Sequence, residues 1–232
     1  MELSAASPVF ELTDVIRVYR DAEVETIALR GIDLTVQTGE FVAVTGRSGS
    51  GKSTLLGLMA AVDRPTAGRV GYRGVDLGHL DEQLRSTLRG SEIGIVFQAQ
   101  NLFSLLTLRE NVELSARLAG RHPTRDEVIG QLAAVGLEDR ADHHANALSG
   151  GEQQRGALAC ILAARPRVLL GDEITGELDT HSADEVLRAV TRLREDTGMT
   201  VILVTHDGDV AARADRVVEL HDGRVAGGRA IQ

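Results

Sequence analysis

The sequence has one cysteine, few aromatic residues and no long uninterrupted hydrophobic run. The single cysteine, Cys160, excludes an internal disulfide bond and fits a reducing compartment. Because its neighbours are apolar, we expect Cys160 to pack in the core rather than to react or bind a metal. The most apolar stretch, residues 156–171, is interrupted by Arg165, Pro166 and Arg167, and the first residues lack the regions of a signal peptide. We therefore expect neither export nor a membrane-spanning segment.

Lysine is nearly absent, and basic residues as a whole are outnumbered. The chain has 25 lysines and arginines against 34 acidic residues, which gives a formal net charge of −9. Proteins that bind nucleic acid by neutralising phosphates carry the opposite balance, so nucleic acid is disfavoured as a partner. Only Lys52 is a lysine. Because an ammonium group is a compact point charge, this indicates a site at Lys52 that a planar guanidinium does not fit.

Apolar runs alternate with segments of helical period along the 232 residues, which is typical of an α/β domain. Near-continuous apolar runs predict strands covered on both faces, as in a buried parallel sheet, and they occupy residues 41–45, 93–97, 168–171 and 200–205. More polar runs near glycine and proline turns predict antiparallel edge strands at residues 10–13, 27–36 and 69–72.

Residues 105–136 show helical spacing of their apolar side chains, which predicts a helical insertion between strands. Residues 124–127 have the pattern of a capping box that opens a helix, and residues 182–185 have the same pattern farther along the chain. The tail, residues 224–232, has little potential to pack in a core.

A glycine-rich motif stands between the predicted strand 41–45 and an apolar helical segment, 54–62, that begins with Thr54. It matches G-x-x-x-x-G-K-[ST] and consists of Gly46, Arg47, Ser48, Gly49, Ser50, Gly51, Lys52 and Ser53. In this motif the glycines expose backbone N–H groups to phosphate oxygens, the lysine reaches the β- and γ-phosphates, and the final hydroxyl binds Mg²⁺. The motif predicts that residues 46–54 bind a nucleoside triphosphate.

Two carboxylates, Asp172 and Glu173, follow the predicted strand 168–171. Downstream of a phosphate loop, the first acid belongs beside Mg²⁺ and the second beside the attacking water. Because successive strand residues point to opposite sides, the two carboxylates can take different roles. Without the phosphate loop upstream, the pattern would fit two solvated acids at the end of a strand as well as it fits a catalytic pair.

Residues 148–155, LSGGEQQR, resemble the signature sequence of ATP-binding-cassette (ABC) ATPases. The resemblance extends over the whole chain, with six motifs in the family's order. It implies that Tyr19 stacks on adenine, that Gln98 is the Q-loop glutamine, that the D-loop ends in Asp179 and that His206 is the switch histidine. Taken singly, Tyr19 would be a packing residue, Gln98 a polar strand end and His206 a solvated loop residue.

The resemblance implies the fold of a P-loop NTPase, in which a RecA-like, mostly parallel sheet carries an antiparallel β edge subdomain and an inserted α-helical subdomain. We expect a single nucleotide-binding domain over residues 1–232. Its ATP-binding core and β subdomain would comprise residues 1–98 and 156–232. The helical insertion, residues 99–155, would carry the signature.

The resemblance also implies how the site works. ATP is held between two chains of a head-to-tail homodimer, and the signature residues Ser149, Gly150 and Gly151 bind the γ-phosphate on the other chain. Ser53, Asp172 and Gln98 surround Mg²⁺, Glu173 polarises the attacking water, and His206 contacts the γ-phosphate. The adjacent residues 142–144, Asp-His-His, fit a solvated loop better than a second metal site, since no i, i+4 spacing unites them.

Residues 97–102 and 105–112 resemble the macrolide-exporter and lipoprotein-release (MacB/LolD-like) branch of the family. This implies an ATPase that drives a separate membrane permease, for export or mechanotransmission, and that sits on the cytoplasmic face of the membrane through that permease. An FtsE-like cell-division ATPase and an importer subunit are the alternatives. DNA-repair ATPases of the SMC type fit poorly, because the residues between Ser53 and Leu148 lack the heptads of a coiled coil. Gly171, Ile174 and Cys160 depart from the family's usual Ala, Pro and Arg.

Overall fold

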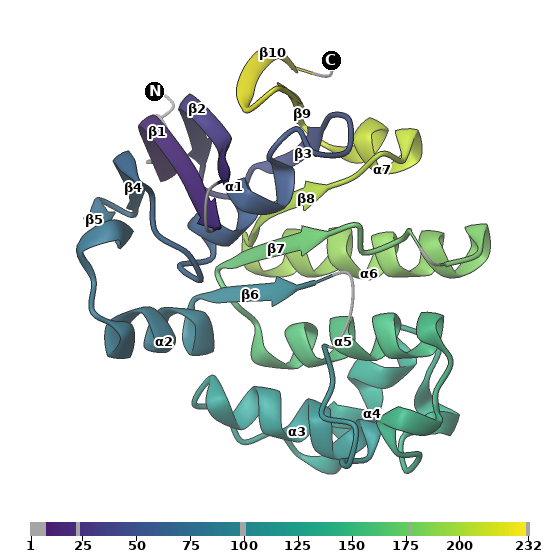
Figure 1. The fold of residues 1–232 in the computed structure, drawn as a ribbon. Helices are drawn as coiled ribbons and strands as arrows, with labels where there is room; N and C mark the ends of the chain where they lie inside the picture. The colour runs from purple at the N-terminus through teal and green to yellow at the C-terminus, as the bar shows by residue number, and fades with distance from the viewer. Residues whose placement is uncertain (1–7, 22–23, 98–100, 177, 231–232) are drawn as a thin grey trace, which may run out of the picture. The chain divides into compact units, whose positions relative to one another are not determined.

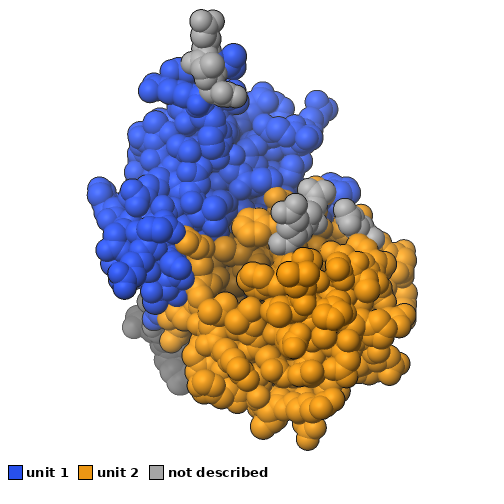
Figure 2. All heavy atoms as spheres, turned by 60° about the horizontal axis from the view of Figure 1, so that its bottom comes forward, with its two compact units in different colours: residues 1–88, 200–232 blue, residues 89–199 orange. Residues whose placement is uncertain are grey.

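A computed structural model describes residues 8–21, 24–97, 101–176 and 178–230 (Figure 1). The chain divides into two compact units, residues 1–88 with 200–232 and residues 89–199, drawn blue and orange in Figure 2. Each unit contains strands and helices of its own.

The first unit contains an antiparallel sheet with the strand order β2-β1-β4-β5. Its strands are β1 (Pro8–Asp21), β2 (Val24–Gln37), β4 (Ala67–Tyr72) and β5 (Val75–Asp76). The rings of Phe10 and Tyr72 are both buried and lie 5.2 Å apart between centroids. The predicted antiparallel strands are therefore present, and β1 and β2 are longer than predicted because their polar stretches remain paired.

The first unit also contains parallel strands. The strand β3 (Phe41–Thr45) lies between β8 (Thr200–Val204) and β9 (Arg216–His221), and both neighbours are parallel to it. The buried side chains of β3 and β8 form a continuous apolar layer, as the runs predicted. The helices of this unit are α1 (Lys52–Met59) and α7 (Gly208–Arg213), with a short 3₁₀ helix at Leu77–His79. The helix α2 (Glu82–Ser91) begins in the first unit and ends in the second.

The second unit pairs β6 (Ile93–Val96) in parallel with β7 (Val168–Asp172). Its helices are α3 (Leu108–Leu118), α4 (Arg125–Ala133), α5 (Gly150–Ala164) and α6 (Thr180–Thr197), with 3₁₀ turns at Glu138–Arg140 and Ala145–Ala147. The helix α5 packs against α3, and the side chains of Leu108, Val112, Ala157 and Leu158 are buried there. Thr124 caps α4 through a capping box with Glu127, which confirms that part of the predicted helical insertion.

One sequence-based expectation was wrong. The capping box expected at residues 182–185 is not the start of a helix, because α6 begins at Thr180 and its N-cap is Asp179. The carboxylate of Asp179 accepts hydrogen bonds from the N–H groups of His181 and Ser182, which lie in the first turn of α6. The helix is therefore capped by Asp179, three residues before the expected cap at Ser182. The tail forms the strand β10 (Arg224–Ala230), which pairs antiparallel with β9. None of the described side chains at residues 224–227 is buried, as expected for a tail with little potential to pack in a core.

Cys160 lies in α5 with 8% of its surface exposed, as expected for a core residue. Burial raises the pKa of its thiol to about 12, so the reactive thiolate does not form at neutral pH. Within the described part of the chain, no helix has the length and apolar character needed to cross a bilayer.

Candidate functional site

The glycine-rich loop folds tightly between β3 and α1. Gly46, Gly49 and Gly51 have φ angles of 146°, 77° and 101°, which side-chain-bearing residues rarely adopt. A Cβ atom on Gly46 would collide with the carbonyl oxygen of Leu220, and one on Gly51 would lie 2.6 Å from the carbonyl oxygen of Ala28. The glycines therefore let one side of the loop press against β9 and β2.

The other side of the loop is open. A Cβ atom placed on Gly49 would meet nothing within 4 Å. Among the described residues, none accepts a hydrogen bond from the backbone N–H groups of residues 51–54, which form the start of α1. Several unsatisfied donors at the positive end of a helix form a site for an anion of the size of a phosphate group.

Lys52 points back over this loop. Its ammonium group donates hydrogen bonds to the carbonyl oxygens of Gly46, at 2.8 Å, and Arg47, at 3.0 Å. Ser48 is exposed beside it, whereas the hydroxyl group of Ser50 is buried and has no hydrogen-bond partner among the described residues. The ammonium group of Lys52 thus already lies at the mouth of the loop. A charged phosphate oxygen is a stronger acceptor than the carbonyl oxygens of Gly46 and Arg47, and it would replace them as the partner of this group.

His206 lies at the same edge of the first unit as the glycine-rich loop. Val44 of β3 is paired with Val204 of the parallel strand β8, and Gly46 and His206 each follow two residues later. His206 is exposed, while Thr205 before it is buried and accepts a hydrogen bond from the N–H group of Asp207. The parallel register accounts for this arrangement of two segments that are far apart in the sequence.

Tyr19 lies near the end of β1 and is 40% exposed. Its hydroxyl group donates to Asp63 at 2.9 Å, and the guanidinium carbon of Arg17 lies 4.4 Å from the centre of its ring. The sequence offered no reason to single out Asp63. Arg17 could have been noticed, because residues two apart on a strand share a face.

In the second unit, Asp172 ends β7 and Glu173 begins the turn that follows. Glu173 has a φ of 49°, in the left-handed region, and its carbonyl oxygen accepts a hydrogen bond from Gly176 at 3.0 Å. The expected strand alternation between the two carboxylates therefore ends at Asp172, and the turn sets the direction of Glu173.

The signature residue Ser149 is the N-cap of α5 and forms a capping box with Glu152. The hydroxyl oxygen of Ser149 accepts from the Glu152 N–H at 3.3 Å, and Glu152 also pairs with Arg140 at 2.9 Å. The N–H of Ser149 and the guanidinium of Arg140 lower the pKa of the Glu152 carboxyl. Because a hydroxyl group both accepts and donates, Ser149 can still donate its proton to an anion beside Gly150 and Gly151.

Asp179 is occupied in capping α6. It accepts from the hydroxyl group of Ser182 at 2.7 Å, a contact that lowers the pKa of the Asp179 carboxyl. The same hydroxyl oxygen accepts from Arg155 of α5 at 2.8 Å. The D-loop end is thus linked to the signature helix through Ser182. Gln98, the remaining predicted site residue, lies outside the described residues.

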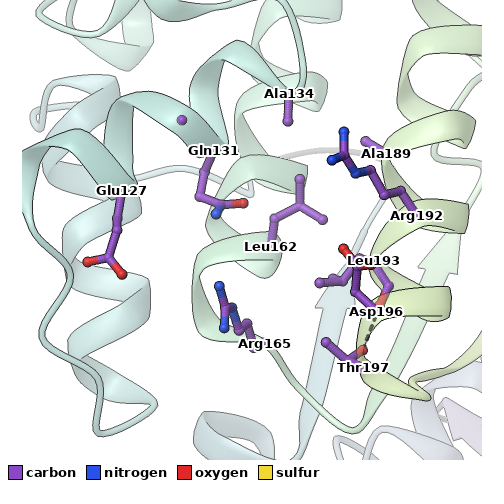
Figure 3. Close-up of a pocket in the computed structure, with 11 residues that line it drawn as sticks. Glu127, Gln131, Ala134, Leu162, Arg165, Ala189, Arg192, Leu193, Asp196 and Thr197 are labelled. Carbon is purple, nitrogen blue, oxygen red and sulfur yellow. Dashed lines mark hydrogen bonds between the residues drawn. The ribbon is translucent and has the colours of Figure 1, made fainter.

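A groove of about 450 Å³ lies among α4, α5 and α6 in the second unit (Figure 3). Leu162 lies in its wall, and the side chains of Gln131, Arg165 and Arg192 also line it. None of the residues predicted for the nucleotide site contributes to this groove.

A strand, a glycine-rich loop and a helix with open N–H groups define a P-loop nucleotide-binding domain. Residues 29–176 match the family model described as "ABC transporter", and the chain belongs to this family. It is an ATP-binding cassette of that family, so the predicted family, fold class and ATPase class are confirmed.

The chain is similar to two kinds of curated relative. It is 46% identical to the lipoprotein-releasing system ATP-binding protein LolD of Anaeromyxobacter dehalogenans, over 95% of this chain and 93% of the relative. It is 45% identical to the macrolide export ATP-binding/permease protein MacB of Hyphomonas neptunium, over 94% of this chain. The chain spans about a third (34%) of that MacB relative's length.

Among solved structures, the chain is similar to the dimeric bacterial ABC transporter cassette MJ0796, with a TM-score of 0.91 and 37% identity. The match covers 96% of this chain and 99% of MJ0796. A second dimeric structure of MJ0796, in a post-hydrolysis state bound to ADP and Pi, matches equally well.

Proposed function

We propose that the chain binds Mg–ATP at residues 46–54 and hydrolyses it at two sites of a head-to-tail homodimer, and that it thereby drives a separate membrane permease. The observation that carries the proposal is the open set of N–H donors around the only lysine of the chain. The ADP and Pi named for the dimeric MJ0796 structure support the same reaction.

The phosphates of ATP would lie against the N–H groups of Gly49, Gly51 and the first turn of α1, with Lys52 at the β- and γ-phosphates. Mg²⁺ would take the hydroxyl oxygen of Ser53 and the carboxylate of Asp172, together with Gln98. These are the oxygen donors that Mg²⁺ prefers, and the remaining positions suit water and phosphate oxygens. When bound, the ion neutralises charge on the phosphate oxygens during transfer.

Glu173 accepts a proton from the attacking water and so directs it at the γ-phosphate. His206, exposed at the edge where the phosphate loop starts, donates to a γ-phosphate oxygen. Most of the catalysis then comes from positioning and charge neutralisation, because phosphoryl transfer needs little covalent chemistry from the protein.

The second chain completes each site. Ser149 donates its hydroxyl proton to the γ-phosphate, and the N–H groups of Gly150 and Gly151 add the positive end of α5. Asp179 of the D-loop lies in the same interface. Two identical chains related by a two-fold axis would form two such sites, each with a phosphate loop from one chain and a signature from the other.

The permease partner is supported by exposed apolar side chains in the second unit. Phe97, Phe103, Leu105 and Leu118 are exposed by 46%, 62%, 82% and 66%. Phe97 and Leu118 also line a groove of about 260 Å³. Large exposed apolar side chains mark interaction surfaces, and we assign these four side chains, which we call the apolar patch, to contacts with an intracellular helix of the permease. The chain then lies on the cytoplasmic face of the membrane through that permease.

The type of permease separates the alternatives within this proposal. A MacB- or LolD-like system exports or transmits force, an FtsE-like ATPase acts on a cell-division membrane protein, and an importer subunit drives uptake. Identity above 40% to both kinds of relative, over most of this chain, favours the MacB/LolD-like alternative.

The membrane assignment predicts that the chain reaches a membrane only through its partner. Coexpressed with the permease that is its partner in this proposal, the parent chain should sediment with membranes, whereas Leu105→Asp, in the apolar patch, should stay in the supernatant. Val24→Asp is the matched control, since Val24 is 65% exposed in the first unit and lies outside the patch. It should behave as the parent. Flotation of the parent chain with protein-free phospholipid vesicles would contradict the assignment.

A further inference from the structure

Three side chains form a cluster at the end of β1. Arg17 and Tyr19 share one face of the strand, and both contact the same carboxylate oxygen of Asp63. The Nε atom of Arg17 donates to it at 2.7 Å and the Tyr19 hydroxyl group at 2.9 Å. The guanidinium group of Arg17 also covers one face of the Tyr19 ring, with 4.4 Å from its carbon to the ring centre.

Asp63 is itself held firmly after the end of α1. Its N–H group donates to the carbonyl oxygen of Gly57 at 3.1 Å, and its carbonyl oxygen accepts from the buried guanidinium group of Arg85. Its second carboxylate oxygen accepts from the N–H group of Arg64 at 2.7 Å. The carboxylate therefore has a fixed place from which it can hold the Tyr19 hydroxyl group.

The strand that carries Tyr19 is tied to the same segment. The hydroxyl oxygen of Thr66 accepts a hydrogen bond from the N–H group of Val18 at 3.0 Å, and the N–H group of Thr66 donates one to the carbonyl oxygen of Ile16 at 2.8 Å. The helix α1, whose first residue is Lys52, thus ends in a segment that is bonded both to the backbone of β1 and to the Tyr19 side chain. Eight helical residues span about 12 Å between these ends.

We propose that Asp63 and Arg17 are positioning residues for the nucleotide base. Asp63 fixes the Tyr19 ring through its hydroxyl group, and Arg17 closes one ring face, so that only the opposite face is free to stack on adenine. Through α1, the base platform is held at a set distance from the phosphate loop. This inference rests on the proposed function, in which Tyr19 stacks on the base.

A ring held in place before binding loses less conformational freedom when the base arrives, so the cluster strengthens ATP binding without touching ATP. Its effect is limited to ligands that carry a base. Tripolyphosphate, which has the phosphates of ATP but no adenine, is the probe that separates this role from a general stabilisation of α1 and the loop.

The test compares dissociation constants for Mg–ATP and Mg–tripolyphosphate in Asp63→Ala and Arg17→Met. Each variant should bind Mg–ATP about fivefold more weakly, close to the loss of one ordinary hydrogen bond, and should bind Mg–tripolyphosphate as the parent does. Arg20→Met is the matched control, because Arg20 pairs with Glu25 and its side chain is 75% exposed. It should change neither constant.

The double variant Tyr19→Ala/Asp63→Ala, compared with Tyr19→Ala alone, shows whether Asp63 acts through the Tyr19 ring. In Tyr19→Ala, the further change Asp63→Ala should leave ATP binding unaltered, since there is no ring left to position. Equal weakening for both ligands in Asp63→Ala would assign it a structural role and overturn the inference. So would unchanged ATP binding in Asp63→Ala and Arg17→Met when Tyr19→Ala binds ATP more weakly. If Tyr19→Ala binds ATP as tightly as the parent, the base-stacking assignment itself is wrong.

Discussion

Glu173→Gln is expected to bind Mg–ATP with nearly the parent affinity and to lose turnover by about 10²- to 10⁴-fold, the usual contribution of a general base. The amide has the shape of the carboxylate, so it can occupy the same place after β7, but it cannot take a proton from water. Because ATP is then bound and not cleaved, the closed dimer should accumulate. Phosphate release measures turnover, and size-exclusion chromatography with and without Mg–ATP measures the shift from monomer to dimer.

The control for this variant is Glu138→Gln, which alters an exposed glutamate of a 3₁₀ turn in the second unit. It should hydrolyse ATP at the parent rate. Undiminished turnover in Glu173→Gln would place the base on another residue, and loss of ATP binding would show that Glu173 is needed for the shape of the turn rather than for chemistry.

Lys52→Ala is expected to weaken ATP binding by about 100-fold and to abolish hydrolysis, because it removes a charge-assisted donor from the phosphates. Lys52→Arg should fail as well, since a planar, extended guanidinium does not place a compact charge where the ammonium group now contacts the carbonyl oxygens of Gly46 and Arg47. Binding titrations and phosphate release give both effects. The midpoint of thermal unfolding should be nearly unchanged, because the side chains that α1 buries come later in the helix and do not include Lys52.

The role of Lys52 can also be tested by chemical modification, because Lys52 carries the only side-chain amine in the sequence. Amine-reactive reagents should modify Lys52 and the terminal amine alone. Mg–ATP and tripolyphosphate should protect Lys52, whereas adenosine should not. Parent-level turnover by either Lys52 variant would contradict the assignment of the phosphate loop.

The parts of the site that could be predicted are those that a contiguous segment encodes. The phosphate loop needs glycines at positions where the backbone has positive φ and where a Cβ would collide, so the pattern of residues 46–53 was sufficient. The capping box of Ser149 and Glu152 is equally local. The apolar runs that became β3 and β8 were recognised because strands covered on both faces need few polar residues.

The parts that could not be predicted depend on contacts between distant segments or on competition between neighbours. The contact between Tyr19 and Asp63 joins residues 44 positions apart, and nothing local to either residue announces it. Asp179 and Ser182 could each cap a helix, and only the observed bonds show that Asp179 does. The pairing of β10 and the left-handed backbone of Glu173 likewise follow from the surrounding fold.

The central claim is that each ATP site combines the phosphate loop of one chain with the signature of the other. Lys52→Ala and Ser149→Arg should each be inactive as homodimers, since every site then carries a defect. A mixed dimer has one site with both defects and one intact site. With random pairing half of the dimers are mixed, so about a quarter of all sites are intact in an equimolar mixture, by two-fold symmetry.

The most direct measurement is therefore the ATPase activity of these two inactive variants after mixing, with exchange between dimers verified by two different affinity tags. A site shared between two chains predicts recovery of activity, up to about a quarter of the parent value. A lower recovery means that closure needs two bound nucleotides, which still requires a shared site. No activity in a mixture whose dimers have demonstrably exchanged would contradict a site shared between two chains.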